Sequence, residues 1–131
     1  MEGRMRDLLA FRLAQANEAL EEARTLNEAR HPRGAINRSY YAMFYAIQAL
    51  LTSRGLTTSK HSGAIELFDR EFVRQNQFGK DFSRWLHQLF ELRQDADYGP
   101  MVEATAEQAR NAIEQAEAFI QQTKGYLSQV S

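Results

Sequence analysis

The sequence predicts an all-α protein, an up-and-down four-helix bundle with an additional short helix. Ala, Leu, Glu, Gln and Arg, which favour helices, are abundant. No segment shows the sustained alternation of apolar and polar residues that strands require. The only two prolines, Pro32 and Pro100, fall at breaks between segments with helical spacing. Because the connections are short, consecutive helices should pack antiparallel.

The first two helices are separated by the break at Pro32. The first segment ends near Arg30, and Pro32 suits the first turn of the second helix, where its missing N–H costs nothing. The second helix stops around Gly55. The apolar residues that recur at helical spacing are Leu9, Leu13, Ala16, Leu20 and Ala23 in the first, and Ile36, Tyr40, Met43, Phe44, Ile47, Leu50 and Leu51 in the second.

Three further helices follow a polar stretch, GLTTSKHSG. The short helix is expected over residues 60–76, and Gly79 separates it from the fourth. Gly99-Pro100 should end the fourth helix, because Gly suits a left-handed cap and Pro cannot continue a helix. The apolar positions of these segments are Ile65, Phe68 and Phe72, then Phe82, Leu86, Leu89 and Leu92, then Ala106, Ala109, Ile113, Ala116, Ile120 and Leu127.

Length and composition place limits on the class of protein. We expect one domain over residues 1–131, with a core that needs neither disulfide nor metal. The chain contains no Cys, which excludes thiol nucleophiles and thiolate metal sites. The first residues lack the apolar run of a signal peptide, and no stretch approaches a membrane span. We therefore expect a soluble, cytoplasmic protein without membrane association.

The charge is unevenly distributed although the net charge is only −1. Residues 1–23 carry a charge of −2 and residues 94–131 a charge of −4. Residues 24–93 have 11 basic and 6 acidic side chains, a charge of +5. The middle of the chain could present a basic face to an anionic partner, or its helix surfaces could simply be lopsided.

The stretch ELRQDADYGP places polar chemistry at the end of the fourth helix. Arg93 continues the stripe of Phe82, Leu86 and Leu89, so its side chain should face inward. Asp97 lies one turn further on the same face and could pair with it. The pair could be structural, or the arginine fork could hold a phosphate. Tyr98 beside it could donate to a phosphate or simply pack.

His61 is the best placed of the three histidines. Lys60 precedes it and Gly63 follows it, where the short helix begins, an arrangement that suits an anion. Such surroundings favour the neutral base form of a histidine. The histidines lack the HExxH pattern and a close carboxylate group, so we expect no metal site and no cofactor.

The second helix is unusually aromatic over NRSYYAMFYAIQALL, residues 37–51. Tyr41 and Tyr45 form a second stripe beside the core stripe, and the apolar surface is wider than one side of a small bundle needs. We therefore expect a partner subunit at Tyr41 and Tyr45. Asn37 and Arg38 bring polar groups to the start of this helix and are candidate binding residues.

These motifs together resemble a known family. NRSYYAMFYAIQALL, then KHSG, then LRQDADYG is similar to the small stand-alone prokaryotic HEPN domain, and the resemblance covers about residues 5–128. It implies a helical bundle that pairs as a homodimer. Many members are metal-independent ribonucleases or toxins, with a minimal nucleotidyltransferase as partner and antitoxin. Their motif is an Arg followed by four to six residues and a His.

This sequence departs from the motif at its histidine. Arg93 matches the arginine, but Tyr98, Gly99 and Pro100 stand where the histidine belongs. A tyrosine, with an ordinary pKa near 10, is a poor base at neutral pH. His61 could supply the missing base if folding brings it close. The sequence thus leaves three functions open: a ribonuclease using Arg93, Tyr98 and His61, a non-catalytic nucleotide- or phosphate-binding protein, and a dimeric adaptor.

Overall fold

The structure is a computed structural model that describes residues 3–98 and 103–130, with the side chains of residues 96–98 excluded. No strand occurs over these ranges, so the predicted all-α class is confirmed. The elements are α1 (Gly3–Glu28), α2 (Pro32–Ser53), α3 (His61–Phe68), a π-helical turn η1 (Asp69–Val73), α4 (Lys80–Tyr98) and α5 (Ala106–Val130).

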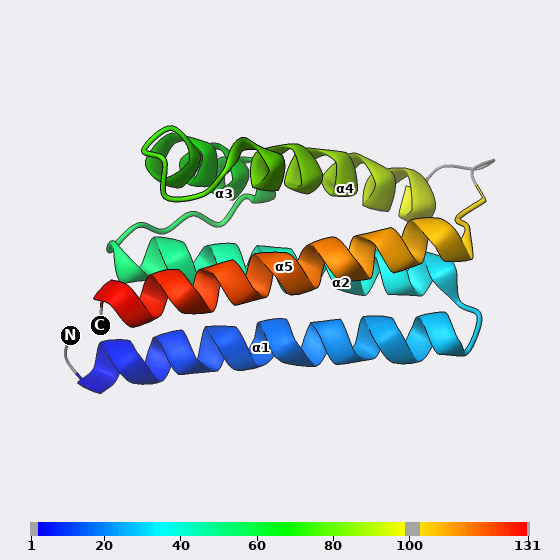
Figure 1. Cartoon of the computed structure of the whole chain (residues 1–131), viewed down its shortest axis with the longest axis horizontal. Helices are drawn as coiled ribbons and strands as arrows, with labels where there is room; N and C mark the ends of the chain where they lie inside the picture. Colours follow the sequence, from blue (N-terminus) through cyan, green and yellow to red (C-terminus); the bar gives the residue numbers. More distant parts are fainter. Residues whose placement is uncertain (1–2, 99–102, 131) are drawn as a thin grey trace.

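The four long helices alternate in direction, with α3 and η1 inserted between α2 and α4 (Figure 1). Helix α2 is the centre of the bundle and packs against α1, α3, α4 and α5. Both described chain ends lie at one end of the bundle, whereas the α1–α2 turn and the end of α4 lie at the other (Figure 1). This arrangement brings the beginning of α2 beside the last turns of α4.

The central position of α2 explains its wide apolar surface within one chain. Twelve of its residues are buried, and Tyr40, Met43 and Ile47 are among those that are fully inaccessible. The buried Ser39 donates its hydroxyl hydrogen to the carbonyl of Ala35 at 2.8 Å, so this polar group is satisfied. The width of the surface therefore does not require a second subunit, and the predicted dimer contact stays a prediction.

The short helix is less regular than the expected helix over residues 60–76. After Phe68 the backbone widens into η1, where the N–H of Arg74 donates to the carbonyl of Asp69, five residues back, at 2.9 Å. Phe68 and Phe72 nevertheless both remain fully buried, with ring centroids 6.0 Å apart. Such π-helical turns are short, and no apolar periodicity marks this one.

Two helix starts follow local sequence signals. Pro32 occupies the first turn of α2, as predicted, with His31 at the N-cap. Helix α5 begins with a reciprocal capping box in which the hydroxyl of Thr105 accepts from the N–H of Gln108 at 3.1 Å. The side-chain oxygen of Gln108 accepts in return from the N–H of Thr105 at 3.0 Å. The predicted helix stop at Gly99-Pro100 lies outside the described residues.

None of the helices in the described ranges is long and apolar enough to cross a membrane.

Candidate functional site

Arg93 points from α4 toward α2 and is half-buried, as its place on the apolar stripe predicts. Its Nη2 donates to the hydroxyl of Tyr41 at 3.1 Å. Its Cζ lies 5.4 Å from the ring centroids of both Tyr40 and Tyr41, within the range of cation–π attraction. The two aromatic rings therefore hold the guanidinium at the seam between α2 and α4.

His61 is the first residue of α3, and its ring stacks on a ring of α2. Its ring lies 4.1 Å from that of Phe44 with an interplanar angle of 11°, and its Nδ1 is 2.8 Å from the hydroxyl oxygen of Tyr40. Gly63 permits this close start of α3, because a Cβ there would stand only 2.7 Å from the Oγ1 of Thr58. Stacking and hydrogen bonding together fix the imidazole on α2.

Tyr40 and Tyr41 join His61 to Arg93. The ring of Tyr41 meets His61 edge-on at 5.7 Å, on the same helix turn that receives Arg93. We call Tyr40, Tyr41, Phe44, His61 and Arg93 the Arg93–His61 cluster. The fold thus brings together the histidine and the arginine, two residues that the sequence spacing could not connect.

The electrostatics of the cluster favour a neutral imidazole. Burial, with a smaller contribution from the positive charge of Arg93, lowers the pKa of His61 below its ordinary value. Burial raises the pKa of the Tyr40 hydroxyl, so that hydroxyl stays protonated near neutral pH. A cationic fork beside an unprotonated imidazole can bind a phosphate and accept a proton at one place.

The candidate binding residues at the start of α2 extend the cluster. The Cζ of Arg38 lies 5.3 Å from the ring centroid of Tyr41, so this ring contacts two guanidinium groups, those of Arg38 and Arg93. The Nε of Arg38 also forms an ion pair with Glu22 at 3.4 Å. Asn37 and Arg38 both line a pocket at the α1–α2 turn.

Three further residues were predicted at the site, namely Lys60, Asp97 and Tyr98. Lys60 is exposed just before α3, and its backbone N–H donates to the Oγ1 of Thr58 at 3.3 Å. The side chains of Asp97 and Tyr98 lie outside the described residues, so the predicted Arg93–Asp97 pair and the catalytic role of Tyr98 stay predictions.

Tyr41 and Tyr45 were predicted to contact a second subunit. Within one chain they are half-buried neighbours, with ring centroids 6.0 Å apart. Tyr41 has the additional contacts to Arg93, Arg38 and His61 described above. No spacing in the sequence indicates these contacts, because they come from α3 and α4.

A second polar cluster escaped the sequence reasoning. The Oδ1 of Asp69 accepts from the hydroxyl of Ser83 at 2.7 Å, and its Oδ2 lies 2.7 Å from the Nε2 of His87. These contacts join η1 to α4. Across the described ranges, no three His, Cys, Asp or Glu side chains are grouped so that they could hold a metal ion.

The fold and the cluster define a small helical bundle with an arginine and a histidine at one seam. The sequence of the chain matches the model of the HEPN domain over residues 9–126. The chain therefore belongs to the HEPN family, as the resemblance of its motifs implied.

Curated relatives cover most of the chain. A protein of Thermotoga maritima named "UPF0332 protein" is 40% identical over 106 residues, which are 81% of this chain and 80% of the relative. A protein of Methanocaldococcus jannaschii named "Putative toxin" is 31% identical over 97% of this chain and 86% of its own length. A second protein of that organism with the same designation is 34% identical over 88% of this chain and 85% of its own length.

Proposed function

We propose that this chain acts as the toxin of a two-component module and cuts RNA without a metal ion. The observation that carries the proposal is the Arg93–His61 cluster, in which one pair of tyrosines holds a guanidinium and a neutral imidazole. Similarity to two proteins named as toxins supports the proposal from an independent direction.

The chemistry would divide between the two polar side chains. Arg93 would hold the scissile phosphate and stabilise the charge that develops on its oxygens. With Nδ1–H donating to Tyr40, the Nε2 of His61 would accept the proton of the RNA 2′-hydroxyl. The 2′-oxygen would then bond to phosphorus while the bond from phosphorus to the 5′-oxygen breaks. The departing oxygen would take a proton from water, and the hydroxide so formed would take the proton from His61, leaving a 2′,3′-cyclic phosphate, a 5′-hydroxyl and a neutral imidazole.

The direct test is cleavage of single-stranded RNA by the purified protein in the presence of a chelator. The native protein should cut, and Arg93→Ala should lose about 100-fold or more in rate, the usual loss when a charge-stabilising donor is removed. Arg84→Ala is the matched control, because Arg84 lies on the same helix, is largely exposed and pairs only with the nearby Asp81 within the described chain. Circular dichroism should show both variants folded.

Three results would count against the proposal. The native protein could leave RNA intact, or Arg93→Ala could cut as fast as the native protein. If Arg93→Ala unfolds while Arg93→Lys remains folded and equally active, the arginine is structural. Saturable binding of a nucleotide without RNA turnover would favour the alternative of a non-catalytic nucleotide- or phosphate-binding protein.

Two partners complete the proposal. The family resemblance supports a homodimer and a minimal nucleotidyltransferase as antitoxin, and the aromatic stripe of α2 suggests Tyr41 and Tyr45 as the dimer contact. Sedimentation of the native protein and of Tyr45→Glu tests the dimer, since a charge at the contact should shift the population toward monomer. Equal sedimentation of the two proteins would argue against this contact.

A further inference from the structure

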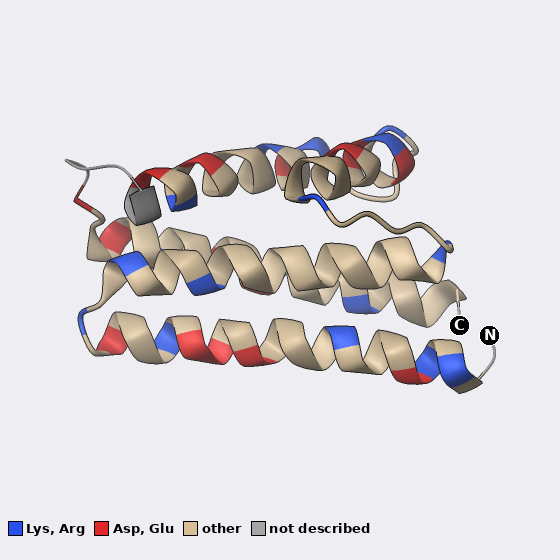
Figure 2. Ribbon diagram, turned by 180° about the vertical axis from the view of Figure 1, so that it is seen from behind, with Lys and Arg blue, Asp and Glu red and all other residues tan. Residues whose placement is uncertain are grey.

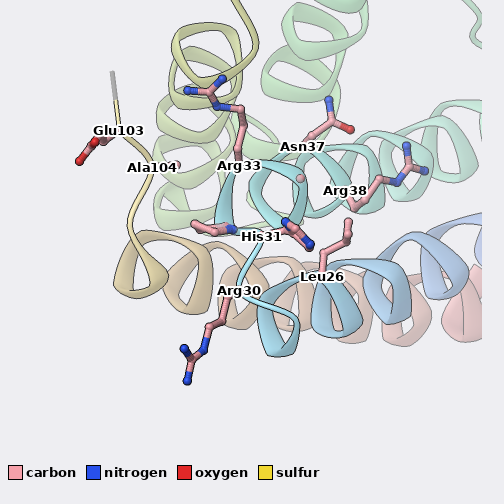
Figure 3. A pocket seen from close by; sticks show the side chains of 10 residues that line it. Leu26, Arg30, His31, Arg33, Asn37, Arg38, Glu103 and Ala104 are labelled. Carbon is pink, nitrogen blue, oxygen red and sulfur yellow. The ribbon is translucent and has the colours of Figure 1, made fainter. Parts of the chain in front are cut away.

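A pocket of about 690 Å³ opens at the α1–α2 turn, beside the segment that precedes α5 (Figure 3). Its polar lining consists of Arg30, His31, Arg33, Asn37, Arg38 and Glu103. Arg30 and Arg33 project from opposite sides of the turn, and His31 lies between them (Figure 3). The pocket is thus open to solvent and has long cationic side chains around its opening.

Basic side chains outnumber acidic ones among the described residues that line this pocket. The lining includes three arginines, Arg30, Arg33 and Arg38, and one carboxylate, that of Glu103. Helix α2 contributes two of these arginines and contains no acidic residue (Figure 2). Glu22 pairs with Arg38 from α1 but does not line the pocket. A polyanion with several phosphates could therefore contact more than one of these arginines.

The backbone at Arg30 is unusual for an arginine. Its φ is 65°, in the left-handed region that glycine and asparagine adopt at lower cost. The residue closes α1 just before His31 and Pro32, and its side chain is exposed. Stability alone would favour a different residue at this position, which is consistent with a use for the charge.

Arg38 links the pocket to the Arg93–His61 cluster through its contact with Tyr41. Arg38 lines the pocket and lies 5.3 Å from the Tyr41 ring, and Arg93 lies 5.4 Å from the same ring. Arg33 precedes Tyr41 by eight residues on α2, which corresponds to about 12 Å along the helix axis. Cationic groups therefore follow one another along α2 from the turn to the cluster.

We propose that the pocket is a remote phosphate subsite for RNA, in which Arg30 and Arg33 hold backbone phosphates beyond the bond held at the cluster. This inference rests on the proposed function, because it assigns the flanking part of the same RNA. The subsite raises affinity for an RNA long enough to span the distance. It contributes nothing to a dinucleotide that occupies the cluster alone.

The test measures binding of a short single-stranded RNA with 2′-O-methyl groups, which the proposed reaction cannot cut. The Arg30→Gln, Arg33→Gln double variant is compared with Arg4→Gln, Arg84→Gln, which removes the same charge near the starts of α1 and α4, outside the lining of the pocket. Loss of two phosphate contacts should reduce the slope of log affinity against log salt by about 1.4. Over a fourfold rise in salt, the double variant should then lose about sevenfold less affinity than the native protein.

A second variant distinguishes the loss of a phosphate contact from misfolding. Asparagine suits the left-handed backbone, so Arg30→Asn should fold at least as well as the native protein. It removes one phosphate contact and should reduce the slope of log affinity against log salt by about half as much as the double variant does. Cleavage of a dinucleotide should be unchanged in both pocket variants. Inorganic phosphate, titrated separately, provides the comparison with a free anion.

The outcomes separate the two claims. If the native protein binds RNA but the pocket variants match the control, the subsite is refuted while the proposed function stands. The subsite is equally refuted if dinucleotide cleavage falls with RNA binding, or if the pocket binds inorganic phosphate but its loss leaves RNA binding unchanged. If the native protein neither binds nor cuts RNA, the proposed function itself fails.

Discussion

The hydroxyl of Tyr40 can be removed by a substitution that keeps the aromatic ring in place. Tyr40→Phe deletes the oxygen that lies 2.8 Å from the Nδ1 of His61. The ring, which is fully buried, keeps its contacts with Phe44 and Phe90 at centroid distances of 6.1 Å and 5.6 Å. The variant therefore isolates one hydrogen bond between α2 and α3.

The expected cost is small but measurable. A neutral hydrogen bond contributes about 0.5–1.5 kcal/mol to the free energy of unfolding. His61 is only half-buried, so water can partly replace the lost partner, and we expect about 1 kcal/mol. For a domain of this size, that loss corresponds to a fall in Tm of roughly 3–5 °C.

Denaturant unfolding of four proteins measures this bond directly. The native protein, Tyr40→Phe, His61→Ala and the double variant form a cycle, and the coupling energy should be about 1 kcal/mol. Tyr45→Phe is the control, because Tyr45 is half-buried on the same helix and its hydroxyl has no hydrogen bond within the described part of the chain. A coupling energy near zero, or equal costs for Tyr40→Phe and Tyr45→Phe, would refute the reasoning.

Three further perturbations test the Arg93–His61 cluster, the Asp69–His87 contact and the core. Arg93→Gln should raise the pKa of His61, because the positive charge of Arg93 opposes protonation of the imidazole; NMR titration should show the rise, and an unchanged or lower value would contradict it. The proposed activity requires unprotonated His61 and is lost as the pH falls through the pKa of this residue. In Arg93→Gln, any residual cleavage should therefore begin to fall at a higher pH than in the native protein when the pH is lowered. Asp69→Asn should cost roughly 1 kcal/mol in unfolding free energy, since it weakens the contact with the half-exposed His87; no loss by denaturant unfolding would contradict this. Phe68→Ala should cost about 3–5 kcal/mol, because it empties a fully buried position, and a loss below 1 kcal/mol would show that the core there can collapse.

Apolar periodicity predicted most of the helices because each long helix buries a stripe against the same core. The stripe of Phe82, Leu86 and Leu89 was long enough to place Arg93 inward, and the structure has its side chain on the rings of α2. Pro32 located the start of α2 for a local steric reason. The π-helical turn after Phe68 was missed, since its core residues keep an ordinary four-residue separation.

The candidate site was harder to predict because its contacts are distant in the chain. Tyr40 and His61 are 21 residues apart, and no spacing rule connects them. The sequence drew attention to Tyr41 as a surface residue of a wide apolar helix, whereas its hydroxyl accepts a hydrogen bond from Arg93. Both features depend on where α3 and α4 cross α2, and helical periodicity contains no information about crossings.

The central claim is that Arg93 and His61 act together on one RNA phosphate. The most direct measurement is the rate of metal-free RNA cleavage by Arg93→Ala, His61→Asn and the variant with both changes, with the product ends identified. If the two groups serve one step, each single variant should be strongly impaired and the double variant little worse than the more impaired single one. Products should carry 2′,3′-cyclic phosphate. Native-like cleavage by the double variant would contradict the account.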